Sequence, residues 1–161
     1  MNNEIHNNIK YTENLLNDIN STDAIEFSKW TKEKANLRYN GKLPKFPLYN
    51  NFIYWCNLGI NVGSEQNKLR PVLVLRTSKN SPICTILPLT TKRLNDQFWF
   101  HIDLEKIDST VLVEQLKVVS KLRITTPYRK RGKLVTISQN DWDNINSQLE
   151  NLYRLRSLKT K

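Results

Sequence analysis

The chain has 161 residues, 39% of them apolar, and a net charge of +10, a size that favours one main domain with an appended segment. No apolar run is long enough to span a bilayer, and the N-terminus lacks the basic-then-apolar pattern of a secretory signal. Cys56 and Cys84 both lie in apolar runs, where buried free thiols are expected rather than a disulfide framework. We therefore expect a cytoplasmic protein.

The charge is unevenly distributed along the chain. Residues 1–27 hold five acidic side chains and one basic one, whereas residues 28–161 hold 10 acidic and 24 basic side chains. A body this basic favours a polyanionic partner, most simply nucleic acid. The alternative is a basic protein with no such ligand.

Two helices are predicted at the start of the chain. Apolar side chains recur at helical spacing over residues 3–20 and again over about 23–37. Asp23 followed by Glu26 makes a capping arrangement for the second helix. Gly and Pro residues near 41–50 then end the helical pattern.

We place a domain boundary in that stretch, with a helical N-terminal extension over 1–45 and the main domain over 46–161. The main domain shows β character, with a basic loop over 126–132. Several short strands with turns between them suggest a small barrel or sandwich. The predicted strands cover residues 52–58, 71–75, 83–89, 99–104, 110–119 and 133–137.

A last helix is predicted after residue 138. Ser138 and Asp141 form an N-terminal cap, and one apolar stripe follows it. Such a stripe packs on the barrel or seals a dimer. Its members are Trp142, Ile145, Leu149, Leu152 and Leu155.

The most informative stretch is the polar loop that runs from Gly63 into the apolar strand 71–75. Arg70 stands where the loop ends. Pro71 fixes φ and donates no ladder hydrogen bond, so we expect it as the first residue of the strand. A guanidinium at this junction is aimed by a rigid element and still reaches solvent, which suits a phosphate.

Several kinds of catalytic site can be excluded from the sequence. No Cys–His metal cluster and no Gly-rich phosphate loop occur in the sequence. The only histidines are His6 and His101, which argues against a two-histidine nuclease. Asp103 and Glu105 share a strand face, and we interpret them as surface charges, with metal binding as a minor alternative.

Arg70 and several polar side chains remain, and they suit phosphodiester chemistry without a metal or another cofactor. RNA supplies its own 2′-hydroxyl nucleophile, so the protein needs only to align it and neutralise charge. Purely structural roles for these residues also stay open. Arg70 would then form a surface ion pair, and Thr90 and Ser109 would cap strand ends. The polar set is Thr90, Thr91, Ser109, Glu65, Gln66, Glu114 and Gln115.

Three separated motifs resemble the PemK/MazF family of toxins. They begin with Ile53-Tyr54-Trp55 and Leu58, followed by Val62–Gln66 and Arg70–Val74. Leu87–Thr90 and Asp108–Leu116 come next. The order and rough spacing agree over about residues 51–157, and three motifs in order are more specific than any one.

The resemblance implies a mainly β, α+β fold, namely an SH3-like small barrel with a C-terminal helix, working as a homodimer. It implies a metal-independent endoribonuclease that cuts single-stranded RNA at a short recognition sequence, leaving a 2′,3′-cyclic phosphate and a 5′-hydroxyl. It also implies a cognate antitoxin partner with an acidic tail, and DNA binding together with that antitoxin.

The resemblance also implies site residues. Arg70 and Thr90 match the family's catalytic pair, and Ser109 matches a residue at or beside the RNA. Because Arg has a pKa above about 12, we assign Arg70 to charge stabilisation before proton transfer. Glu65, Gln66, Glu114 and Gln115 match the family's flanking polar positions. Apart from the resemblance, the charge of the basic loop supports nucleic-acid binding. The residues expected to contact RNA are Glu65, Gln66, Lys68, Thr91, Gln115, Arg129, Lys130 and Arg131.

The sequence differs from the family pattern at two places, and two alternative functions stay open. Asn51-Phe52 stands where relatives commonly have Gly-Asp, and Gly59-Ile60-Asn61 lacks a frequent Pro, so the RNA preference of relatives cannot be transferred. One alternative function is a non-catalytic toxin on the same barrel, as in the CcdB-like gyrase poisons. The other is a basic nucleic-acid-binding module.

Overall fold

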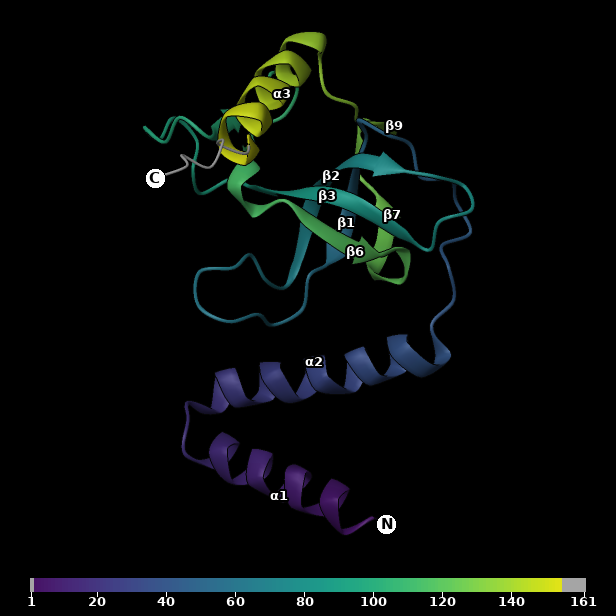
Figure 1. Cartoon of the computed structure of the whole chain (residues 1–161), viewed down its shortest axis with the longest axis vertical. Coiled ribbons are helices and arrows are strands. Elements are labelled where there is room, and N and C mark those ends of the chain that lie inside the picture. Colours follow the sequence, from purple (N-terminus) through teal and green to yellow (C-terminus); the bar gives the residue numbers. More distant parts are fainter. Residues whose placement is uncertain (1, 155–161) are drawn as a thin grey trace, which may run out of the picture. The chain divides into compact units, whose positions relative to one another are not determined.

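The computed structural model describes residues 2–154 and shows the predicted α+β fold (Figure 1). The chain divides into two compact units between Gly41 and Lys42. The first contains α1 (Asn3–Asn17) and α2 (Ser21–Asn40). The second contains β1 (Ile53–Asn57), β2 (Leu69–Thr77), β3 (Ile83–Thr90), β4 (His101–Asp103), β5 (Thr110–Leu112), β6 (Lys117–Ser120), β7 (Ile124–Pro127), β8 (Arg129–Lys130), β9 (Lys133–Leu134) and α3 (Gln139–Tyr153).

The helical unit begins its second helix earlier than predicted. Asn20, not Asp23, is the N-cap, because its side chain accepts a hydrogen bond from the Thr22 backbone at 2.8 Å. Asp23 falls in the first turn of α2, where the positive end of the helix dipole stabilises a carboxylate. No residue of α1 or α2 is buried, so this unit lacks the packing that stabilises most protein helices.

The second unit is built on one antiparallel sheet in the order β4-β5-β3-β2-β1-β7, with β6 also paired to β3. Strand β2 is covered on both faces, as its near-continuous Val and Leu content predicts. Leu73 belongs to the core cluster that α3 covers, whereas Val72 and Val74 belong to a second cluster with Tyr54 on the other face.

The predicted strand 110–119 is wrong as a single element. It is split into β5 and β6 by a three-residue 3-10 turn, Val113–Gln115. Strand β3 pairs Leu89 with Val111, but it pairs Ile86 with Lys117. An uninterrupted antiparallel ladder would bring residue 114 opposite Ile86, so the turn takes up three extra residues.

Pro71 is not the first residue of its strand, because β2 begins at Leu69. Pro71 stands opposite Trp55 of β1, and the ladder between β2 and β3 begins only at Val72. Val74 donates to the carbonyl of Phe52 at 3.0 Å, and hydrogen-bonded pairs alternate along an antiparallel ladder. The Pro71 nitrogen therefore points away from β1, toward an edge with no paired neighbour.

Other strand boundaries also differ from the prediction. Residues 126–132 are not a simple loop, since β7 pairs with β1 and β8 pairs with β9 in a hairpin. Strand β4 is shorter than the predicted 99–104. Asn51 has φ of 65°, a left-handed conformation that Asn tolerates better than most residues, which explains why it can stand where relatives commonly have Gly.

Helix α3 confirms the predicted cap and stripe. Ser138 accepts from the Asp141 backbone at 3.0 Å, and the Asp141 carboxylate accepts from the Ser138 backbone at 2.9 Å. Ile145 is fully buried in the core cluster, with Trp142, Leu149 and Leu152 packed against it. Leu155 lies outside the described residues.

Both cysteines are buried and free, as predicted. Burial raises the pKa of Cys56 to about 12 and that of Cys84 to about 11. Within residues 2–154, no helix combines the length and the hydropathy needed to cross a membrane.

We predict that Ile145→Ala lowers the free energy of unfolding by about 3 kcal/mol, because it opens a cavity in the core under α3. Urea unfolding measures the change. Asn144→Ala is the control, since Asn144 is exposed on the same helix and should change stability by less than about 0.5 kcal/mol. Equal effects of the two variants would show that α3 does not cover the core.

The buried thiols predict a loss of stability at alkaline pH. Both folded pKa values lie above the ordinary value of 9.0, so their contribution is complete below pH 9 and is lost as pH rises toward the folded values. Urea unfolding should therefore show a steeper decline above pH 9 for wild type than for Cys56→Ala/Cys84→Ala. Parallel declines would contradict the assignment.

Candidate active site

The candidate site begins where β2 and β3 separate. Their last paired residues are Val72 and Pro88, after which β3 pairs with β5 through Leu89. Arg70 lies two residues before Val72 and Thr90 two residues after Pro88. Side chains alternate along strands, so Arg70 and Thr90 fall on the same face at the same end of the strand pair.

Arg70 is partly buried, and it contacts the loop residue that lies three positions before it. Its Nε donates to the Asn67 carbonyl at 2.9 Å, which ties the end of the preceding loop to the strand. Within residues 2–154 this is the one hydrogen bond of the guanidinium, and no carboxylate pairs with it. Among the described residues, the surface ion pair considered from sequence is therefore not formed, and the Nη groups remain available for a phosphate.

Thr90 and Ser109 are both buried, with exposed fractions of 5% and 4%. The Thr90 hydroxyl oxygen accepts from the Lys92 backbone at 3.2 Å, so it does cap the strand end. It keeps its own proton for donation to a ligand. Ser109 lies in the loop just before β5, and the first residue of β5, Thr110, pairs directly with Thr90.

The loop between β1 and β2 is closed at its base. Leu58 donates to the Lys68 carbonyl at 2.9 Å, and Lys68 donates to the Gly59 carbonyl at 2.5 Å. Across the loop, the Asn61 amide donates to the Gln66 carbonyl at 2.7 Å. Positive φ values of 85°, 61° and 64° at Gly59, Gly63 and Lys68 allow this tight path.

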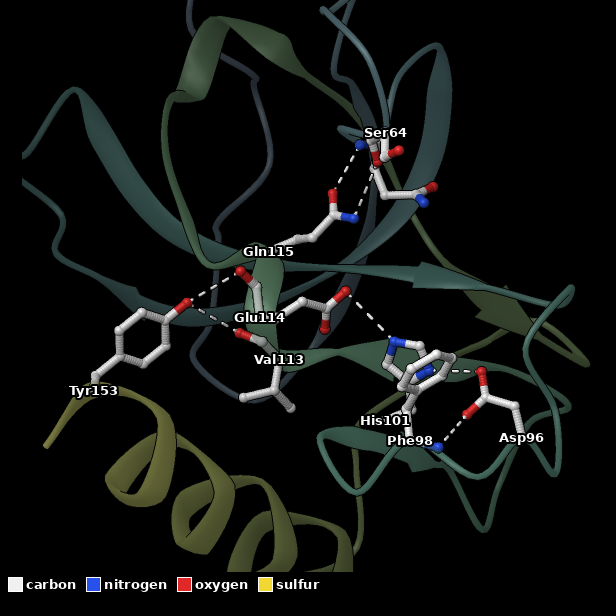
Figure 2. Close-up of polar contacts among 9 residues, drawn as sticks. Ser64, Asp96, Phe98, His101, Val113, Glu114, Gln115 and Tyr153 are labelled. Atoms are coloured by element: carbon white, nitrogen blue, oxygen red, sulfur yellow. Dashed lines mark hydrogen bonds and ion pairs between the residues drawn. The ribbon is translucent and has the colours of Figure 1, made fainter.

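Gln115 holds the tip of this loop, as Figure 2 shows. Its Oε1 accepts from the Gln66 backbone at 2.7 Å, and its Nε2 donates to the Ser64 carbonyl at 3.3 Å. Beside it, Lys117 and Glu65 form an ion pair at 2.7 Å. The structure thus brings Glu65, Gln66 and Gln115 to the same loop tip, but their contacts position the loop: Gln66 pairs with Gln115, and Glu65 pairs with Lys117.

His101 links the same 3-10 turn to the segment after β3, a contact that the sequence reasoning missed. Its Nδ1 lies 2.7 Å from Asp96 and its Nε2 lies 3.4 Å from Glu114 (Figure 2). The side chain is 7% exposed. Burial raises the pKa of Asp96, but the hydrogen bonds from His101 and the Phe98 backbone lower it more, so the net shift is downward.

The turn has a third anchor in α3. The Tyr153 hydroxyl donates to the carbonyls of Val113 and Glu114, at 3.4 and 3.2 Å (Figure 2). The turn Val113–Gln115 is thus held by α3 and in turn holds both the β1–β2 loop and the segment after β3. One signal was present in the sequence, since Glu114-Gln115 follows an apolar strand.

The other predicted residues are less central. Thr91 and Lys68 are exposed at the edges of the site. The basic residues Arg129, Lys130 and Arg131 lie on the separate β8–β9 hairpin. Their contacts are local, with the Arg129 guanidinium on the Gly132 carbonyl at 2.8 Å and the Lys130 ammonium on the Lys106 carbonyl at 2.7 Å.

No group of three His, Cys, Asp or Glu side chains suited to a metal ion occurs among residues 2–154. Asp103 accepts from the Thr110 hydroxyl and from the Asn95 backbone. Hydrogen bonds from Ser138 and then Asn140 lower the pKa of Glu105. These two carboxylates therefore support local structure, whereas the sequence reasoning interpreted them as solvated surface charges.

The fold defines a small β-barrel protein with a C-terminal helix. Residues 51–153 match the PemK-like, MazF-like toxins of type II toxin–antitoxin systems. The chain belongs to this family.

Two relatives illustrate the match in sequence. Endoribonuclease EndoA of Bacillus subtilis strain 168 is 29% identical over 82 residues, covering 45% of this chain and 71% of the relative. Endoribonuclease MazF of Staphylococcus saprophyticus is 26% identical over 119 residues, covering 66% of this chain and 94% of the relative.

Solved structures agree on the fold. MazF of Deinococcus radiodurans aligns with a TM-score of 0.57 at 17% identity, covering 69% of this chain and all of that one. The MazE–MazF structure from the same organism aligns with a TM-score of 0.53 at 17% identity, with 70% and 100% coverage.

We predict that Gln115→Ala loosens the β1–β2 loop, because it removes both contacts of the loop tip with the 3-10 turn. Hydrogen exchange at the Gln66 amide should become at least tenfold faster, since about 1.4 kcal/mol of protection corresponds to tenfold. Gln139→Ala, on exposed helix α3 surface, is the control. Unchanged exchange at Gln66 would rule out the anchoring role.

Proposed function

We propose that this chain is an endoribonuclease toxin of a type II toxin–antitoxin system that cleaves single-stranded RNA without a metal ion. The observation that carries the proposal is the joint placement of Arg70 and Thr90 on one face where β2 and β3 separate. That corner lies within the family match, and both sequence relatives are named endoribonucleases. Their names favour RNA cleavage over a non-catalytic toxin or a simple binding module.

The chemistry follows from what the corner offers. The RNA 2′-oxygen attacks the adjacent phosphorus and loses its proton, while the bond to the 5′-oxygen breaks and that oxygen gains a proton. The products are a 2′,3′-cyclic phosphate and a 5′-hydroxyl. The phosphoryl oxygens carry the developing charge, and fixed cationic donors at such oxygens are worth several kcal/mol.

The residues take separate roles in this proposal. Arg70 presents its Nη groups to the phosphoryl oxygens, while its Nε bond to Asn67 fixes the guanidinium plane. Thr90 donates its hydroxyl proton to the phosphate or orients the 2′-oxygen. Ser109, in the loop just before the strand that pairs with Thr90, contacts the nucleotide. The β1–β2 loop, held by Gln115, forms one wall of the RNA groove.

The proposal includes partners. The neighbouring structure of MazE with MazF supports a cognate antitoxin, which would neutralise this basic protein with an acidic segment and bind DNA together with it. We further propose a homodimer acting in the cytoplasm, where its RNA substrate occurs. Residues 46–161 would carry the activity and 1–45 would be an appended extension, because the family match begins at residue 51.

We predict that Arg70→Ala lowers the rate of RNA cleavage by at least about 10²-fold, the usual loss when one charge-stabilising donor is removed. Cleavage of a long RNA in EDTA, with the ends mapped, measures it. Arg76→Ala is a matched control, since Arg76 is exposed on the same strand, and it should retain wild-type activity.

Three results would contradict the proposal: wild-type rates for Arg70→Ala, loss of wild-type cleavage in EDTA, or products with 5′-phosphate ends. The same assay on residues 46–161 alone tests the domain assignment. An inactive but folded 46–161 fragment would show that the extension belongs to the catalytic unit.

A further inference from the structure

A groove of about 460 Å³ lies on the β8–β9 hairpin, and four basic side chains line it. β9 is labelled in Figure 1. Lys130, Arg131 and Lys133 come from the hairpin, whereas Lys106 comes from the loop between β4 and β5. The sequence singled out only the hairpin run, because Lys106 is more than 20 residues away along the chain.

The charges of this groove are not neutralised by the protein. Among residues 2–154 no carboxylate forms an ion pair with any of the four side chains. Two of the ammonium groups instead contact backbone carbonyls: Lys130 donates to Lys106 at 2.7 Å, and Lys106 donates to Ile137 at 3.2 Å. The cations are therefore held in place, with their net charge left for a ligand.

The turn of the hairpin supports the same reading. Arg131 has φ of 50° and Gly132 has φ of 78°, the left-handed pair of a two-residue hairpin turn. Asn or Gly fits the first of these positions without strain, whereas an Arg there is conformationally costly. A strained cation at the tip of a basic groove points to a function for its charge.

The groove and the candidate active site each take one residue from the β4–β5 loop. That loop carries Lys106 and, three residues later, Ser109. The Ser109 carbonyl accepts from Leu104 at 2.9 Å, which closes the loop, and Thr110 pairs with Thr90. The chain therefore connects the groove to the candidate site through three residues of one closed loop.

We propose that this groove binds backbone phosphates of the RNA substrate beyond the cleaved nucleotides, without reading their sequence. The inference rests on the proposed ribonuclease function. Lysine and arginine side chains that meet phosphates supply affinity but little sequence information.

RNA fits this groove better than an acidic peptide does. Tight protein interfaces draw most of their binding energy from a few buried anchor side chains, often aromatic. The apolar side chains that line the groove are Leu134 and Val135, and Val135 is only 8% exposed because it belongs to the core. The lining offers charge but no pocket for such an anchor.

The test is the salt dependence of binding to a 2′-O-methyl RNA, which keeps every phosphate but lacks the nucleophile. The probe is longer than about 16 nucleotides, so that it spans more than one site. Lys130→Gln/Arg131→Asn should weaken binding about tenfold and make the slope of log affinity against log salt shallower by about 1.4, the value for two single-strand phosphate contacts. A probe of about four nucleotides should bind both proteins equally.

The control is Arg76→Gln/Lys79→Gln, which removes the same charge from exposed residues near the β2–β3 turn. It should leave the slope unchanged. Because Asn relieves the strain at position 131, the groove variant should melt no lower than wild type. Lys133→Gln is a second, single-site variant, expected to reduce the slope by about 0.7.

Equal slopes for wild type and both groove variants would overturn the proposal. So would a groove variant that loses affinity for polyglutamate while keeping its RNA slope, since the groove would then serve an acidic peptide. Failure of the proposed function gives a different result, namely no cleavage of unmodified RNA by wild type. The modified RNA reports binding in either case.

Discussion

The separation of β3 from β2 at Val72 and Pro88 is the constraint on which the rest of the site depends. Up to that pair, β3 is a central strand between β2 and β6, and beyond it β3 turns its pairing to β5. The separation frees the edge of β2 at Pro71, where a residue without an N–H is then harmless. It also leaves the partly exposed Arg70 and the buried Thr90 on one face at the point where the two strands part, so a rigid sheet holds both polar groups.

The 3-10 turn that follows β5 is the second half of the same arrangement. Strand β3 pairs first with β6 and then with β5, and the register of these two pairings differs by three residues. The turn Val113–Gln115, between β5 and β6, supplies those three residues. Residues lifted out of a ladder have free side chains and free backbone groups, which must be satisfied elsewhere. Tyr153, His101 and the β1–β2 loop provide those partners. Strand pairing, loop position and helix packing are therefore coupled through one short turn.

Much of this fold was predictable because local signals and burial agree. The Ser138–Asp141 cap, the stripe on α3 and the two-sided apolar character of β2 were all correctly interpreted from sequence. The split of 110–119 was not, because no Gly or Pro marks it and its cause is the pairing of β3. Arg70 and Thr90 were found through motifs, yet the anchoring contacts of Gln115 and His101 join residues far apart in sequence. Lys106 was not predicted as part of the basic groove for the same reason, since only the folded chain brings it beside the hairpin.

The Gln115 contact has a consequence for the time course of synthesis. It joins residues 49 positions apart, so the loop wall cannot close until the ribosome has released the chain beyond the 3-10 turn, and the α3 anchor at Tyr153 comes later still. Contacts of long sequence separation form late because chain closure must precede them. A nascent or prematurely terminated chain would hold Arg70 and Thr90 but not the assembled groove. For a protein proposed to destroy messages, the order of residues along the chain delays assembly of this groove until the residues through Tyr153 have been synthesised.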